Sequence, residues 1–101
     1  MPLLPKFIIT TSGYFRMGMV NQHRDLLEGD ERCIGGGYYR FDHVSARLML
    51  DRSSWDFGIP KWHYLDRIKV PSYLRGMRII YQYDDNTPDF VVNDELEVEY
   101  Y

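Results

Sequence analysis

Three stretches of the chain have the residue pattern of β-strands. Lys6–Thr11 is dense in β-branched and aromatic residues, and Met77–Tyr83 has a similar make-up. Near the end of the sequence, apolar residues alternate with glutamates, which is the two-residue period of a strand with one apolar face. We expect residues 95–100 to form an edge strand whose apolar side chains face the protein, namely Leu96, Val98 and Tyr100.

The middle of the chain predicts a β-hairpin. Tyr38–Phe41 and Arg47–Leu50 are strand-like, and residues 42–45 between them have the composition of a turn. Directly before this hairpin stand three consecutive glycines. Glycine weakens a strand unless a neighbouring group must come close to the backbone, so we expect a close approach there.

Two further segments have a helical pattern. Met17–Leu27 places apolar residues at helical spacing, and His23 lies four residues from both Met19 and Leu27, on the inward face. Leu65–Arg75 is expected to be helical in part. Together these elements predict an α+β fold, a single domain with a mixed β-sheet of about five or six strands and two helices.

The composition indicates a folded domain in a reducing compartment. A chain of 101 residues with 45% hydrophobic residues makes one globular domain. It begins without the basic region and cleavage site of a signal peptide, and no apolar run approaches the length of a membrane span, so we expect no membrane association. The only cysteine, Cys33, has no partner for an internal disulfide, and a cytoplasmic location fits best.

The charge is unevenly distributed along the chain. Residues 84–101 hold seven acidic residues and no Lys or Arg, whereas the other 83 residues carry 12 basic and eight acidic residues, a net charge of +4. We therefore divide the chain into a domain over residues 1–83 and an acidic C-terminal extension over residues 84–101. The overall charge of −3 gives no general attraction to nucleic acid, while the mildly basic body suits an anionic ligand.

Two short motifs look like pieces of a protein kinase. Gln22–Leu27 contains His-Arg-Asp-Leu, and Asp56–Gly58 reads Asp-Phe-Gly. The kinase catalytic loop, however, needs an asparagine five residues after its aspartate, and Asp30 stands at that position. The glycine-rich phosphate loop, the Val-Ala-Ile-Lys strand and the Ala-Pro-Glu motif are absent from the sequence. We therefore exclude a kinase, and His23 needs another explanation.

A lone histidine on a helix face is more often a structural residue than a catalytic one. His23, however, is accompanied in the sequence by other residues that could bind phosphate. Lys6 heads the first strand, the glycines follow the helix, and a Ser-Ser loop ending in Gly58 follows the hairpin. Turns rich in glycine or serine present backbone N–H groups to an anion, lysine adds a positive charge, and histidine can move a proton near pH 7. These are the components of a phosphate pocket.

The order of these pieces resembles the janus/ocnus family, which is known for protein phosphohistidine phosphatase. The similarity covers roughly residues 6–83, and its most specific piece is Cys-Ile-Gly-Gly-Gly at Cys33–Gly37. The matching segments are KFIIT, NQHRDLL, CIGGGYY, DRSSWDFGIPKWH and MRIIY. The chain departs from the family at Tyr38, where the family usually has arginine, and at Arg24, where it has a small residue.

The resemblance implies a site. His23 matches the catalytic histidine, Lys6 and Ser54 match phosphate-binding residues, and the backbone N–H groups of Arg24 and Trp55 match donors to phosphate oxygens. The matched glycines, which would give the backbone room for close approach, are Gly35, Gly36 and Gly37.

The implied activity is hydrolysis of phosphohistidine, or a related phosphoramidate, on a protein substrate. The resemblance implies no cofactor, and the three widely spaced histidines and one cysteine predict no metal site. Two mechanisms fit these residues, with His23 either as general base or as nucleophile. A non-catalytic phospho-ligand-binding domain is the alternative: Tyr38 favours it, whereas Lys6, His23 and Ser54 together favour the enzyme. The sequence does not predict an oligomeric state.

Overall fold

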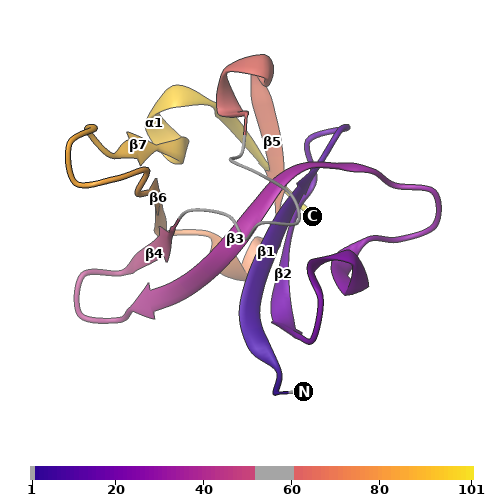
Figure 1. Cartoon of the computed structure of the whole chain (residues 1–101). Coiled ribbons are helices and arrows are strands. Elements are labelled where there is room, and N and C mark those ends of the chain that lie inside the picture. Colours follow the sequence, from indigo (N-terminus) through magenta and orange to yellow (C-terminus); the bar gives the residue numbers. More distant parts are fainter. Residues whose placement is uncertain (1, 52–60) are drawn as a thin grey trace.

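The structure is a computed structural model that describes residues 2–51 and 61–101. Strands dominate it, and its helical elements are short (Figure 1). The elements in chain order are β1 (Leu4–Thr10), β2 (Phe15–Val20), η1 (His23–Leu26), β3 (Cys33–Asp42), β4 (Arg47–Leu50), η2 (Trp62–Tyr64), β5 (Arg67–Val70), η3 (Ser72–Leu74), β6 (Arg78–Tyr81), β7 (Phe90–Val91), α1 (Val92–Glu95) and β8 (Glu97–Tyr100).

The strands form two sheets. The larger has six strands in the order β2-β1-β3-β4-β6-β7, with all pairs antiparallel except β4 and β6. The smaller sheet is the parallel pair β5-β8. The α+β class with a mixed sheet is confirmed at this level, and the predicted strands at Lys6–Thr11 and Met77–Tyr83 and the hairpin correspond to β1, β6 and the β3–β4 pair.

The predicted helix over Met17–Leu27 was wrong, whereas Leu65–Arg75 is helical in part, as expected. Over Met17–Leu27 the chain continues as β2 to Val20 and then makes one 3-10 turn, η1. Gly18 is a poor helix former, and antiparallel pairing along β1 outweighs the helical spacing of the apolar residues. Leu65–Arg75 contains β5 and η3, because Ile68 and Val70 bury alternate side chains in strand geometry.

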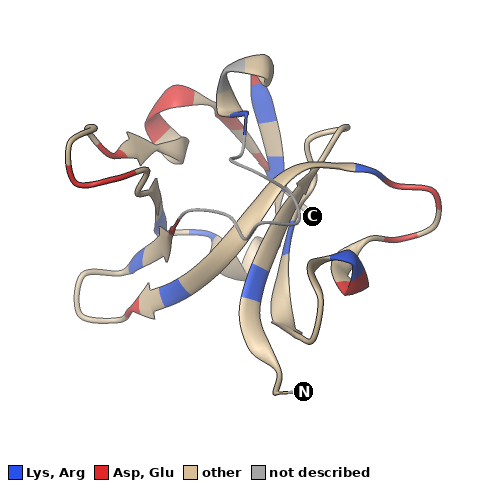
Figure 2. Ribbon diagram, in the orientation of Figure 1, with Lys and Arg blue, Asp and Glu red and all other residues tan. Residues whose placement is uncertain are grey.

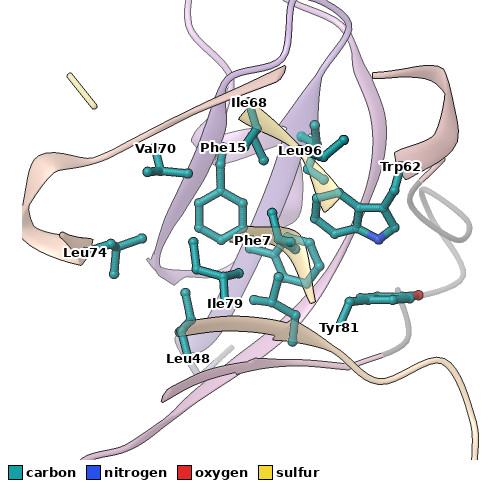
Figure 3. Packing of buried hydrophobic residues seen from close by; sticks show 13 residues of the cluster. Phe7, Phe15, Leu48, Trp62, Ile68, Val70, Leu74, Ile79, Tyr81 and Leu96 are labelled. Carbon is teal, nitrogen blue, oxygen red and sulfur yellow. The ribbon is translucent and has the colours of Figure 1, made fainter. Parts of the chain in front are cut away.

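One face of the large sheet carries the hydrophobic core. Phe7 and Ile9 in β1 point to this face together with Leu48, Leu50 and Ile79, and all five are buried. The small sheet, η2 and α1 cover them (Figures 1 and 3). The rings of Phe7 and Phe15 stack at the centre with centroids 5.5 Å apart, and Trp62 meets Tyr81 edge-on beside them.

The acidic segment after Asp84 packs against the same core. Val92 and Leu96 are buried, and Val98 and Tyr100 are partly buried against the cluster. Among the described residues, β8 pairs only with β5, so the predicted edge strand with its apolar side facing inward is confirmed over Glu97–Tyr100. In the described ranges, no helix is long and apolar enough to span a membrane.

Candidate functional site

The opposite face of the large sheet carries Lys6 near its centre. In β1 the side chains alternate, so Lys6 points away from the core that receives Phe7. Gly18 in β2 and Tyr38 in β3 are its cross-strand neighbours. The lysine is only 8% exposed, although Lys is among the residues least often buried.

His23 lies over this face as the first residue of η1. The turn is held by the Asp25 carboxylate, which accepts from the backbone N–H of Gln22 at 2.9 Å, and by the Asp25 N–H, which donates to the Gln22 carbonyl. The ring is 1% exposed, and its Nε2 lies 2.9 Å from the carbonyl oxygen of Gly37. Because a carbonyl only accepts, Nε2 must carry the proton of that bond.

Gly36 allows the histidine to sit this close. A Cβ at this position would lie 2.6 Å from the carbonyl oxygen of Phe7 and 3.1 Å from Cδ2 of His23. Only glycine therefore fits between β1 and the imidazole. These contacts of β3 with β1 and with His23 are the close approach expected from the three glycines. All three glycines are buried, namely Gly35, Gly36 and Gly37.

The Lys6 ammonium has an unusual set of neighbours. It donates a hydrogen bond to the backbone carbonyl of Asn21 at 2.6 Å, and it lies 5.9 Å from the centre of the Tyr38 ring. Among the described residues, no carboxylate lies within ion-pair distance of it. A buried charge is normally paired, so this position suits an anionic ligand.

Tyr38 joins the lysine to the histidine. Its ring meets the His23 ring edge-on at 5.7 Å, and its face lies toward the Lys6 ammonium. An aromatic face attracts a cation. Tyr38 therefore contacts the ammonium at a position where the resemblance implies an arginine. The structure thus brings together Lys6, His23, the glycines and Tyr38, which lie far apart in the sequence.

Three predicted site residues remain, namely Arg24, Ser54 and Trp55. Arg24 lies in η1 with an exposed side chain. Ser54 and Trp55 lie outside the described residues, so the serine loop expected to complete the pocket is not part of the description.

A second feature, which sequence reasoning missed, lies on the other side of Tyr38. An open groove of about 770 Å³ is lined by Tyr38, Asp51, Gln82 and the β6–β7 connection, including Asp84, Asp85 and Asp89. Figure 2 shows this connection as one of the acidic loops of the molecule. The Asp51 carboxylate accepts from the Tyr38 N–H at 3.2 Å. Such a groove repels a free anion, so phosphate would have to bind on the Lys6 side.

Cys33 at the start of β3 has the character of a structural thiol. Partial burial raises the pKa of this thiol, which lowers the fraction of reactive thiolate at neutral pH. Within residues 2–51 and 61–101, no group of three His, Cys, Asp or Glu side chains could hold a metal ion.

Comparisons of the chain with protein-family models, with curated proteins and with solved structures find no match. The site must therefore be interpreted from its own geometry.

Proposed function

We propose that this protein is a metal-independent phosphatase that hydrolyses phosphohistidine, or a related phosphoramidate, on a protein. The observation that carries the proposal is the Lys6 ammonium, 8% exposed and with no described carboxylate beside it, packed with the buried His23 imidazole against the glycine strand. Burial of a charge without an ion-pair partner is costly, and ionisable groups in such environments cluster at functional sites.

The hydrogen bond to Gly37 orients the imidazole for proton transfer. With the proton on Nε2, the neutral ring has its lone pair on Nδ1. In the proposed reaction a water oxygen attacks phosphorus and its proton passes to Nδ1 of His23. The P–N bond breaks, the departing imidazole nitrogen of the substrate takes up a proton from solvent, and His23 returns its proton to solvent, which leaves inorganic phosphate and histidine.

The negative charge on the phosphoryl oxygens needs positive groups around it in the transition state. In this proposal Lys6 supplies the full charge, and Ser54 with the backbone N–H groups of Arg24 and Trp55 supplies the remaining donors. Nucleophilic attack by Nδ1 of His23, with a phosphohistidine intermediate that water then hydrolyses, uses the same tautomer. A cytoplasmic location belongs to the same proposal, since it suits the lone Cys33 thiol.

A phospho-ligand-binding domain without activity is the second candidate. Two observations favour it: the His23 ring is only 1% exposed, and Tyr38 occupies the place of the expected arginine. Binding needs the charge of Lys6 but does not need a group that transfers protons.

Phosphate release from a phosphohistidine-bearing peptide, measured together with peptide binding, tests both candidates. We expect release by the wild-type protein and a fall of about 10²–10⁴-fold in the His23→Ala variant, which is the usual contribution of a positioned base. His43→Ala is the matched control, because His43 is an exposed histidine in the β3–β4 turn. Binding without release by the wild-type protein would favour the binding domain, and absence of both would reject the two candidates.

A further inference from the structure

Among the strands that the structure describes, β2 has one edge without a partner along most of its length. The carbonyl of Phe15 points away from β1, since it accepts from the Tyr101 hydroxyl at 2.7 Å. Successive residues of an antiparallel strand direct their N–H and C=O groups to opposite edges, so Met17 and Met19 also point outward. Among the described residues, no group bonds the backbone of Met17 or Met19 on that edge.

This edge faces a groove because β2 and β5 separate there. The two strands meet at the bridge between Tyr14 and Lys69, where the Lys69 N–H donates to the Gly13 carbonyl at 2.8 Å. Beyond this bridge they diverge, and β2 becomes the outer strand of the large sheet (Figure 1). Beside β2 lies a groove of about 380 Å³ whose apolar lining comes from β2, η1 and the residues after β5, namely Met17, Leu26, Pro71, Tyr73 and Tyr101.

The charges around this groove are mainly negative. Asp25 and Glu28 line it, and its one cation, among the described lining residues, is Arg16. The Arg16 guanidinium is already held by Glu31 at 2.8 Å and by Glu28 at 3.3 Å. Two carboxylates therefore pair with the one guanidinium, and Asp25 adds a further negative charge to the lining, which favours a partner that carries positive charge.

The shape of the groove decides between two kinds of occupant. Side chains from η1, from η3 and from Tyr101 line the groove together with those of β2, so the exposed edge of β2 is recessed. The β2 strand of a second copy would lie in its own groove in the same way, so the two edges could not reach each other. An extended peptide is narrow enough to enter, and its backbone can bond the outward groups of Met17 and Met19.

We propose that the groove beside β2 binds an extended peptide segment of a partner protein as an added strand. An apolar side chain of the peptide would lie among Leu26, Tyr73 and Tyr101, and a flanking Lys or Arg would face Asp25 and Glu28. The hydrogen bonds to the added strand would stop before Phe15, because the Phe15 carbonyl already accepts from the Tyr101 hydroxyl. This site is separate from the Lys6–His23 cluster and does not depend on phosphatase activity.

Selection of linear peptides from a phage-displayed library on the full chain, followed by anisotropy with the best labelled peptide, tests the proposal. We expect selected peptides with an apolar residue next to Lys or Arg. Met19→Pro should weaken binding at least about fivefold, because it removes one backbone donor from the edge. Proline is tolerated there because that N–H is outside the ladder with β1. Met19→Val keeps the donor and should stay within about twofold.

Amide hydrogen exchange of the wild-type protein gives a second measurement, which does not depend on how Met19→Pro folds. The amides of Met17 and Met19 should exchange faster than that of Gly18 and should gain protection when the peptide is added. Failure to select a peptide, equal binding by Met19→Pro, or an unchanged exchange rate at Met17 and Met19 would each overturn the proposal. Protection that rises with protein concentration in the absence of peptide would overturn it in favour of a second copy.

Discussion

The two faces of the large sheet bury different kinds of side chain. The face toward β5, β8 and η2 buries aliphatic and aromatic residues, with Phe7 and Phe15 at the centre. The opposite face buries Ile8, Met49 and Ile80 but also three polar residues, Lys6, Thr10 and His23. Each face receives alternate residues of the same strand β1, so the difference is set by the sequence, residue by residue.

This difference separates residues kept for stability from residues kept for another reason. Burial of an apolar side chain lowers the free energy of the folded state without further conditions. A buried ammonium lowers it only with compensating partners, and Lys6 has one hydrogen bond to a carbonyl among the described residues. We therefore expect substitutions in the apolar core to change mainly the stability of the fold, and substitution of the buried ammonium to change mainly ligand binding.

Substitution in the apolar core should have the largest effect on stability. Phe7→Ala removes a fully buried ring that stacks on Phe15, and it should lower the free energy of unfolding by about 3–5 kcal/mol. Urea denaturation followed by circular dichroism measures this change. A loss below about 1 kcal/mol would mean that this face is not the main source of stability.

Gly36→Ala tests the close packing on the polar face. The added Cβ would lie 2.6 Å from a backbone oxygen, so β1 or His23 must shift, and we expect a loss of about 1–3 kcal/mol. Gly18→Ala is the matched control, since its Cβ would meet the end of the Leu26 side chain at 3.3 Å. Equal losses in the two variants, measured by urea denaturation, would contradict the packing of His23 against the glycine strand.

The polar face should also respond to acid. The Arg16 guanidinium donates to the Glu31 carboxylate and holds its pKa below the ordinary value of 4.5. This interaction stabilises the fold above pH 4.5 and is lost as the pH falls through the lowered pKa. Glu31→Gln should lower the free energy of unfolding at pH 7 by about 1 kcal/mol. The variant and wild type should then converge in stability at low pH, and a constant difference from pH 7 to pH 2 would contradict this assignment.

Lys6→Met should have the smallest effect on stability and a large effect on ligand binding. Methionine has similar length without the charge, so the free energy of unfolding should stay within about 1 kcal/mol of wild type or rise. Binding of inorganic phosphate, measured by calorimetry, should be lost. Unchanged phosphate binding would show that the buried ammonium is not an anion site.

The sequence predicted the strands whose pattern is local. Lys6–Thr11, Arg47–Leu50 and Met77–Tyr83 are strand-like in composition, and pairing in the sheet agrees with that composition. Met17–Leu27 was assigned wrongly because its apolar spacing fits a helix, whereas the β1–β2 hairpin holds the first part extended. Local periodicity contains no information about that pairing.

Parts of the site could also be predicted from a local sequence pattern, and parts could not, because they depend on strand pairing. The three consecutive glycines in the sequence indicated a close approach, and the structure gives that approach to β1 and His23. The acidic groove could not be found, because Asp51 and the β6–β7 connection meet only through the parallel pairing of β4 with β6. The contact of Tyr38 with Lys6 likewise depends on the register of β1 and β3.

The parallel pairing of β5 with β8 has a consequence for synthesis of the protein. Residues 67–70 pair with residues 97–100, and the Tyr101 backbone then bonds the Val70 carbonyl and the Ser72 N–H. Until residues 97–100 have been made, the pairing available to β5 among the described residues is the bridge from Lys69 to Tyr14. We therefore expect β5 to remain without its partner strand until Glu97–Tyr100 have left the ribosome, which delays completion of this side of the core.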